Sequence, residues 1–150
     1  MHQLYNGLST FGKWVCSMNG TLGDKANKFG LKPGYALDLV TGYDFNKSEG
    51  RAKAWDIIRK DQPALIVGSP ECTMSSALQN LSKWSTDKQR RLEEARRHLA
   101  FMCEIYEYQM SVGKWVLHEH PATASSWKEI CIRKLWKQPG VKATIADQCM

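Results

Sequence analysis

Residues 63–72, PALIVGSPEC, are the most informative segment of this 150-residue chain. Residues 64–67 are all apolar, and an apolar run without alternation is typical of a strand that is covered on both faces. The Gly-Ser-Pro that follows ends the strand and begins a loop that carries a thiol, Cys72. The segment therefore predicts a buried strand of a parallel sheet, with a reactive side chain just beyond its carboxyl end.

Strand and helix patterns alternate on both sides of this segment. Strand patterns occupy residues 13–17, 35–39, 64–67, 114–118 and 141–146. Helix patterns occupy residues 21–29, 49–60, 126–136 and a longer stretch from 86 to a stop at Gly113. This alternation predicts an α/β fold, a three-layer Rossmann-like sheet that is mostly parallel and has helices on both faces. No repeat, low-complexity tract or linker divides the chain, so residues 1–150 are expected to form one domain.

Capping patterns indicate where the helices begin. Ser48 is expected to cap the helix that follows it. The spacings from Thr86 to Gln89 and from Ser126 to Glu129 match capping boxes, in which two side chains satisfy the free N–H groups of a first turn. These positions are predicted helix starts.

The longest helix has an apolar stripe at three- and four-residue steps, the pattern of one buried face. The stripe comprises Leu92, Ala95, Leu99, Met102, Cys103 and Tyr106. These residues are interpreted as core rather than as cofactor contacts. The basic residues between Lys88 and Arg97 alternate with Glu93 and Glu94, which favours a solvated helix face.

Composition limits the class of protein. The net charge of +6 is compatible with a polyanionic partner such as nucleic acid, without proving one. No apolar run approaches the roughly 20 residues that span a bilayer, and the first ten residues lack a signal pattern, so an intracellular protein without a membrane partner is expected. The five cysteines include no Cys-x-x-Cys pair, which argues against a disulfide framework or zinc ribbon and favours reduced, mostly buried thiols.

Ligands of parallel α/β sheets bind beyond the carboxyl ends of the strands, and polar residues follow each predicted strand here. Asn19-Gly20 precedes a predicted helix, whose first N–H groups can bind a cofactor, although turn glycines are common. Asp38 follows about 20 residues later, where nucleotide-binding sheets often place an acid on ribose hydroxyls. Asp44 can accept from an adenine amino group. Either acid can instead serve only its own turn.

Cys72 and Glu119 follow two of the predicted strands. A thiol on a loop after a buried strand, near helix termini, is in a setting that favours the nucleophilic thiolate, although a lone cysteine is more often a small buried hydrophobe. Glu119, at the end of an apolar strand, can hold a proton for general-acid chemistry or form a loop salt bridge. Side chains alternate in direction along a strand, so the flanking His118 and His120 cannot both face one metal with Glu119 unless the strand ends there, and no metal site is expected.

Two of these segments resemble cytosine-5 DNA methyltransferases. Residues 68–76, GSPECTMSS, are similar to the Pro-Cys-x-x-Phe-Ser loop of that family. Glu119-His120-Pro121 is similar to its Glu-Asn-Val or Glu-Asn-Pro motif. Residues 37–38 and 42–44 look like the acids that hold S-adenosylmethionine, and residues 17–23 lie where the glycine-rich cofactor loop belongs.

The resemblance implies an S-adenosylmethionine-dependent methyltransferase that acts on cytosine in DNA. Cys72 would attack carbon 6 of a flipped cytosine, and Glu119 would protonate or hydrogen-bond ring nitrogen 3 while carbon 5 takes the methyl group. The cofactor-binding residues that the resemblance implies are Ser17, Asn19, Gly20, Asp38, Asp44, Ser69 and Pro70.

The chain departs from the family pattern at several positions. The family proline before the cysteine is Glu71 here, and its charge opposes ionisation of the thiol. Ser75 stands for a phenylalanine, His120 for an asparagine, and the first loop lacks Phe-x-Gly-x-Gly. The sequence ends at Met150, before the family's target-recognition region, which a partner chain could supply.

Other functions stay open on the sequence. A non-catalytic, degenerate methyltransferase-like module would bind nucleic acid or a protein partner, and Glu71 favours it. A cysteine hydrolase would pair Cys72 with His118 or His120, but no oxyanion glycine motif is present. A zinc deaminase is disfavoured because the sequence lacks its Pro-Cys-x-x-Cys.

Overall fold

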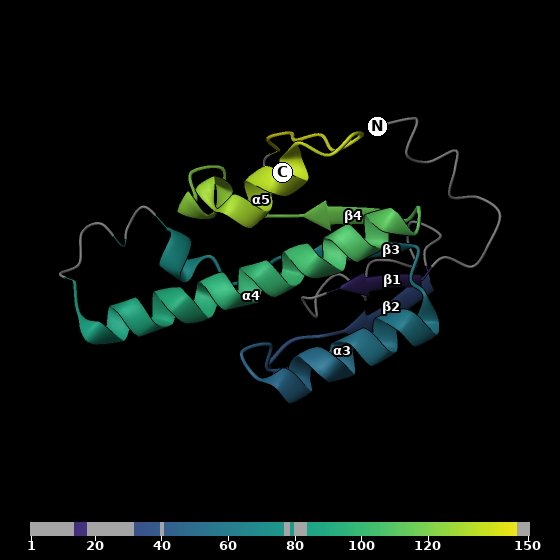
Figure 1. The fold of residues 1–150 in the computed structure, drawn as a ribbon, viewed down its shortest axis with the longest axis horizontal. Helices are drawn as coiled ribbons and strands as arrows, with labels where there is room; N and C mark the ends of the chain where they lie inside the picture. Colours follow the sequence, from purple (N-terminus) through teal and green to yellow (C-terminus); the bar gives the residue numbers. More distant parts are fainter. Residues whose placement is uncertain (1–13, 18–31, 40, 77–78, 80–83, 147–150) are drawn as a thin grey trace.

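The strands form one parallel sheet in the computed structural model, which describes residues 14–17, 32–39, 41–76, 79 and 84–146 (Figure 1). β1 (Trp14–Ser17), β2 (Lys32–Ala36), β3 (Leu65–Gly68) and β4 (Trp115–His118) lie in the order β2-β1-β3-β4. Every pairing is parallel. The α/β class with a parallel sheet, predicted from the alternation of patterns, is confirmed.

Three α-helices are described, α3 (Ser48–Asp61), α4 (Thr86–Ser111) and α5 (Ile130–Trp136). α4 runs across the sheet, with α3 beside the β2 edge and α5 beside the β4 edge (Figure 1). Two 3-10 turns, η2 (Thr73–Ser75) and η4 (Ser125–Lys128), lie in the loops after β3 and β4. Within the described residues no helix has the length and apolar character needed to cross a membrane.

One hydrophobic core joins the three helices to the central strand β3. Ile66 of β3 is fully buried in it. Its other members are Leu37, Phe45, Ala54, Ile58, Leu99, Phe101, Met102, Cys103, Ile105, Tyr106, Ile132 and Leu135. On β4, by contrast, Trp115 and Leu117 are 52% and 54% exposed, while Val116 between them packs against the core. The helix predicted over residues 21–29 lies outside the described residues, and the three-layer arrangement stays a prediction.

α4 approaches the carboxyl end of β3 very closely. A Cβ atom on Gly68 would lie 1.8 Å from Tyr106 Oη and 2.1 Å from Met102 Cε, so any larger residue would require these buried side chains to shift. The predicted stripe of α4 is confirmed as core in its C-terminal part, but Leu92 and Ala95 are only half-buried. The N-terminal half of α4 therefore extends beyond the core.

Two predicted strands differ from those observed. The second begins at Lys32 and ends at Ala36, because β2 is the edge of the sheet, where Pro33 needs no ladder partner on its outer side. Residues 141–146 form no strand and are mostly exposed. That segment does contain apolar side chains, but Ile145 is 84% exposed, so the segment is not buried against the sheet.

Helix starts also differ from the predicted caps. α3 has Lys47 at its N-cap without a side-chain bond, and Ser48 is already helical. The cap of α4 is Ser85, whose Oγ accepts from the backbone N–H of Lys88 at 3.2 Å. Thr86 lies one residue inside the helix, because Ser85 supplies an equivalent oxygen one position earlier.

The start predicted at Ser126 is a 3-10 turn rather than the beginning of an α-helix. α5 itself begins at Ile130, with Glu129 at the N-cap and no side-chain cap bond. The Glu129 carboxylate instead accepts a hydrogen bond from Arg96 of α4. The carboxylate that a capping box requires is therefore engaged in a tertiary contact with Arg96.

Candidate functional site

The loops after β3 and β4 meet at one edge of the sheet. The two strands are neighbours in register, with Gly68 opposite His118, as the expected placement of Cys72 and Glu119 requires. The Glu119 N–H donates to the Gly68 carbonyl at 2.9 Å, which extends the ladder by one bond. Beyond it, the Ser69 hydroxyl donates to Glu119 Oε2 at 2.7 Å. Glu119 is thereby joined to the loop that carries Cys72.

His120 is a second link between these loops. Its Nε2 lies 3.1 Å from the Pro70 carbonyl oxygen, and its Nδ1 bonds the Ser126 hydroxyl. Because a carbonyl only accepts, Nε2 carries the proton and Nδ1 accepts from Ser126. Burial lowers the pKa of His120, which favours this neutral form. The sequence indicated no such structural link, since Pro70 lies 50 residues away along the chain.

His118 lies behind this link, toward α4. Its Nδ1 is 3.1 Å from the Tyr106 hydroxyl, and its buried Nε2 has no hydrogen-bond partner among the described residues. Burial, followed by the nearby His120, lowers the pKa of His118 to about 4. The His118 ring is centred 5.5 Å from that of His120 and 5.4 Å from that of Trp127. The two histidine rings therefore lie close together, as residues two apart at the end of a strand do.

Cys72 is a free, half-buried thiol that directly precedes the single turn η2. Within the described residues neither His118 nor His120 hydrogen-bonds to it, and both nitrogens of His120 are already engaged. The cysteine–histidine pair of a hydrolase is therefore not formed. The neighbouring Glu71 side chain is exposed.

The two acids after β2 are held by their own turns. Asp38 Oδ1 accepts from the Thr41 N–H at 2.8 Å and from its hydroxyl at 3.2 Å. Asp44 Oδ1 accepts from the Asn46 N–H at 3.0 Å, and Oδ2 lies 3.3 Å from Lys47 Nζ. Both carboxylates thus have a local structural role, whichever ligand they bind.

A cavity of about 290 Å³ nevertheless collects four of the predicted cofactor-binding residues: Asp38, Asp44, Ser69 and Pro70. Tyr43 and Phe45 supply an apolar wall. Of the remaining predicted residues, Ser17 lies in β1 opposite Ala36 and Val67, while Asn19 and Gly20 lie outside the described residues.

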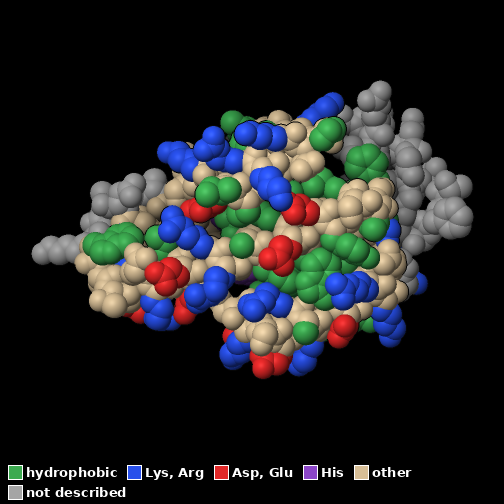
Figure 2. All heavy atoms as spheres, in the orientation of Figure 1, with side chains coloured by type: hydrophobic (Ala, Val, Ile, Leu, Met, Phe, Trp, Pro, Cys, Tyr) green, Lys and Arg blue, Asp and Glu red, His purple; other side chains and the backbone are tan. Residues whose placement is uncertain are grey.

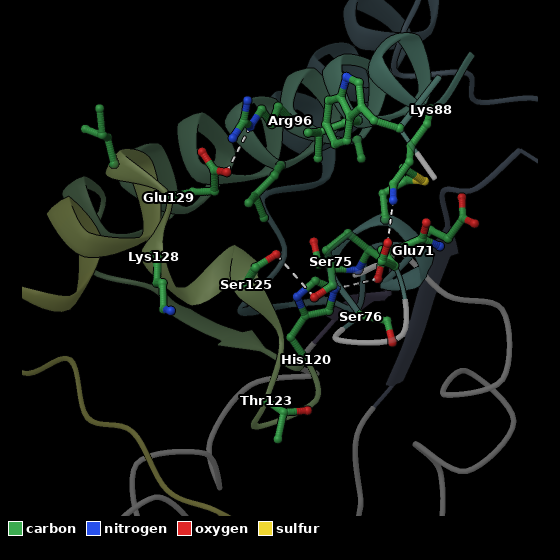
Figure 3. A pocket seen from close by; sticks show the side chains of 18 residues that line it. Glu71, Ser75, Ser76, Lys88, Arg96, His120, Thr123, Ser125, Lys128 and Glu129 are labelled. Atoms are coloured by element: carbon green, nitrogen blue, oxygen red, sulfur yellow. Dashed lines mark hydrogen bonds and ion pairs between the residues drawn. The ribbon is translucent and has the colours of Figure 1, made fainter. Parts of the chain in front are cut away.

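A larger cavity, of about 690 Å³, lies between the N-terminal half of α4 and the loops after β3 and β4 (Figure 3). Its polar lining includes Ser75, His120, Ser125 and Lys128, which come from both loops. The Ser125 hydroxyl donates to the Ser75 carbonyl at 3.2 Å across its floor. The sequence did not predict this cavity, because the half-buried apolar residues of α4 that line it belong to a stripe interpreted as core.

The charges on α4 are largely neutralised locally. Arg90 lies 2.7 Å from Asp87 and 2.6 Å from Glu94, and Gln89 donates to Glu93 at 2.7 Å. Lys and Arg side chains lie over all three helices, with Asp and Glu among them (Figure 2). The prediction of a solvated helix face is confirmed for this part of the chain.

Neither metal ligands nor similarity to known proteins assigns a function to the chain. Among the described residues no three His, Cys, Asp or Glu side chains are grouped so that they could hold a metal ion. Comparison with known proteins finds no matching family model, no similar curated protein and no similar solved structure. The functional argument therefore depends on the geometry of the two cavities and the loops between them.

Proposed function

We propose that the chain is an S-adenosylmethionine-dependent methyltransferase-like domain that acts on cytosine in DNA, with Cys72 as nucleophile and Glu119 as its partner. The observation that carries the proposal is the 2.7 Å hydrogen bond from Ser69 to Glu119. It joins the Cys72 loop to the Glu119 loop at the carboxyl edge of neighbouring parallel strands, where such sheets bind ligands.

The relation between the two cavities supports a two-substrate reaction. Pro70 and Glu71 line both of them, so the segment that leads into Cys72 forms the wall between the cavities. A methyl donor on one side and a base on the other would both lie near this wall. Holding two reactants in fixed geometry is the main contribution a protein makes to such a transfer.

The smaller cavity is proposed to hold S-adenosylmethionine. Its aromatic wall suits the adenine ring, and Asp38 and Asp44 suit the ribose hydroxyls and the amino group. Their turn bonds do not prevent this, since an ionised carboxylate has about four acceptor positions, and they fix its direction. The three-layer arrangement, with Asn19 and Gly20 completing the cofactor site, belongs to the same proposal.

The flipped cytosine is proposed to enter between the loops after β3 and β4, beside the larger cavity, whose lining includes Glu71 and His120 but neither Cys72 nor Glu119. Ser69 occupies Oε2 of Glu119, and within the described residues Oε1 accepts no hydrogen bond, so it can face ring nitrogen 3. Cys72 would attack carbon 6 as the thiolate. Because Glu71 stands where the family has proline, little methyl transfer is expected, and Glu71→Pro is expected to increase it.

A non-catalytic module that binds nucleic acid or a protein partner is the second candidate. The observation that favours it is the occupation of Asp38 and Asp44 by their own turns. An intracellular location is expected for either function.

Titration calorimetry with S-adenosylmethionine and S-adenosylhomocysteine separates the two candidates. The enzyme proposal expects binding that Asp38→Ala weakens several-fold, since one hydrogen bond contributes about 1 kcal/mol. Asp56→Ala is the matched control, because Asp56 is an exposed acid on α3 outside the cavity. Absence of binding to the folded wild-type chain would favour the module.

Methyl transfer is then tested with tritiated cofactor and cytosine-rich DNA, single-stranded and duplex. Label that is slow for the wild type, faster for Glu71→Pro and absent for Cys72→Ser supports the proposed roles. Equal labelling by wild type and Cys72→Ser would exclude Cys72 as nucleophile.

A further inference from the structure

Cys103 and Cys131 are carried by α4 and α5, two helices that pack against each other. Cys103 of α4 is 3% exposed within the core, and Cys131 of α5 is half-buried against the same cluster. The two thiols are close enough to shift each other's pKa. Neither cysteine has a place in the proposed reaction.

Two ion pairs between the same helices hold these thiols opposite each other. Arg96 Nε lies 2.9 Å from Glu129 Oε1, and Lys134 Nζ lies 2.9 Å from Glu107 Oε1. Cys103 lies between Arg96 and Glu107 along α4, and residue 131 lies between the two partners on the other segment. The two segments are therefore joined on both sides of the thiols.

The two thiols differ in acidity. The neighbouring thiol of Cys103, helped by the backbone N–H groups of Cys131 and Ile132, lowers the pKa of Cys131 to about 7. The interaction with Cys131, together with burial, raises the pKa of Cys103. Because burial disfavours the charged thiolate, the half-buried Cys131 ionises more readily than the buried Cys103.

We propose that Cys131 and Cys103 form a redox-active pair in which Cys131 is the peroxide-sensitive thiol and Cys103 resolves it to an intramolecular disulfide. The Cys131 thiolate attacks one oxygen of hydrogen peroxide, the O–O bond breaks, and sulfenic acid and hydroxide form. The Cys103 sulfur then attacks the Cys131 sulfur, the S–O bond breaks, and the leaving hydroxide takes the Cys103 proton. Two thiols are oxidised, and one peroxide is reduced to two waters.

The disulfide would close a loop over residues 103–131, which contains β4, Glu119, His120 and η4. Oxidation would therefore fix the position of the loop that carries Glu119, and resistance to unfolding should rise because a closed loop restricts the unfolded chain. The pair is independent of the proposed methyltransferase activity. A dithiol of this kind also agrees with the absence of a permanent disulfide framework from the sequence.

Peptide mapping after stoichiometric hydrogen peroxide tests the pair directly. Trypsin should release Cys103 in residues 98–114 and Cys131 in residues 129–133, each with one cysteine. The expected product is these two peptides linked, in the monomer, with loss of two hydrogen atoms, and dithiothreitol should reverse it. Cys72→Ser is the matched control and should give the same link.

The single variants identify the order of events. In Cys103→Ala, Cys131 should stop at sulfenic acid, which dimedone traps, whereas in Cys131→Ala the residue at 103 should stay reduced. The oxidation rate should rise as pH passes about 7; Glu104, Glu107, Glu129, Lys134 and Tyr106 are the other titratable groups around the pair. Faster oxidation of Cys72, or a disulfide of Cys131 with any other cysteine, would overturn the proposal, and the wild-type map decides even if a variant fails to fold.

Discussion

The loop after β2 and the loops after β3 and β4 lie at the same sheet edge but are built in different ways. In the β2 loop the carboxylate of Asp38 bonds Thr41, three residues away, and that of Asp44 bonds Asn46, two residues away. In the other loops the bonds from Ser69 to Glu119 and from His120 to Pro70 each span 50 residues.

This difference determines how much of the fold must form before each region can form. A turn held by its own side chains costs little chain entropy and can form before the rest of the sheet. The contacts between the β3 and β4 loops require that both strands are already paired and that α4 is seated on them. We therefore expect the β2 loop to be robust and the Cys72–Glu119 region to depend on global folding.

The largest expected effect comes from Gly68→Ala, at the point where β3 passes into its loop. The new Cβ would overlap Tyr106 and Met102, both buried, so the destabilisation should reach about 3 kcal/mol or more. Urea denaturation followed by circular dichroism measures it.

Gly113→Ala is the matched control for this change. Gly113 has φ of +73° but no atom within 4 Å of its Cβ position, so alanine there should cost only about 1–2 kcal/mol of backbone strain. Equal losses in the two variants would show that α4 does not press on the end of β3.

The sequence predicted the parallel sheet because periodicity is a local property of the chain. The apolar run of residues 64–67 and the buried part of the α4 stripe both follow from it. It also identified Asp38 and Asp44, whose bonds lie within three residues of each acid. The sequence could not predict whether each acid bonds its own turn or a ligand, since both would use the same carboxylate oxygen atoms.

Long-range contacts account for the predictions that were wrong. His120 bonds both Pro70 and Ser126, and these bonds depend on where β4 ends. The spacing of the three residues along the chain does not predict such contacts. Likewise, Leu92 fits the apolar stripe but lies beyond the sheet that would bury it. Residues 141–146 likewise fit a strand pattern but form no strand, and Ile145 is 84% exposed.

The second largest effect is expected from acid, which should lower the stability of the fold through His118 of β4. His118 has its pKa lowered from 6.5 to about 4, so the unfolded chain binds a proton there more readily than the folded protein does. Stability from His118 is complete above pH 6.5 and is lost as pH falls toward about 4, and the difference between the two values corresponds to about 3 kcal/mol at most.

Denaturation midpoints measured from pH 7 to pH 4 check this dependence. His118→Gln removes the titrating ring and should flatten the profile over that range, although it lowers stability at pH 7. His98 and His120, whose pKa values burial also lowers, remain as a weaker background. An unchanged slope in His118→Gln would assign the acid sensitivity to those two residues.

A smaller loss is expected from His120→Ala. The change leaves the Pro70 carbonyl and the Ser126 hydroxyl without their buried partner, at a cost of about 2 kcal/mol. His120→Asn keeps one donor and one acceptor and should recover part of the loss. If alanine and asparagine behave alike, the hydrogen bonds of His120 do not hold the two loops together.

The smallest effects are expected in the β2 loop. Asp38→Ala and Asp44→Ala should each cost no more than about 1 kcal/mol, because the bonds lost are partly exposed and water can replace them. The salt bridge from Asp44 to Lys47 should add little, since the Lys47 side chain is 71% exposed. Urea denaturation of the two single variants and the double variant gives these values.

The double variants then test the comparison itself. Asp38→Ala and Asp44→Ala share no partner, so their losses should add within about 0.5 kcal/mol. Ser69→Ala and His120→Ala both remove hydrogen bonds between the same pair of loops. After one bond is lost, the other should contribute less to stability, so the double variant should lose less free energy of unfolding than the sum of the single variants. Additive losses at Ser69 and His120, together with coupled losses at Asp38 and Asp44, would reverse the assignment of local and long-range construction to the two regions.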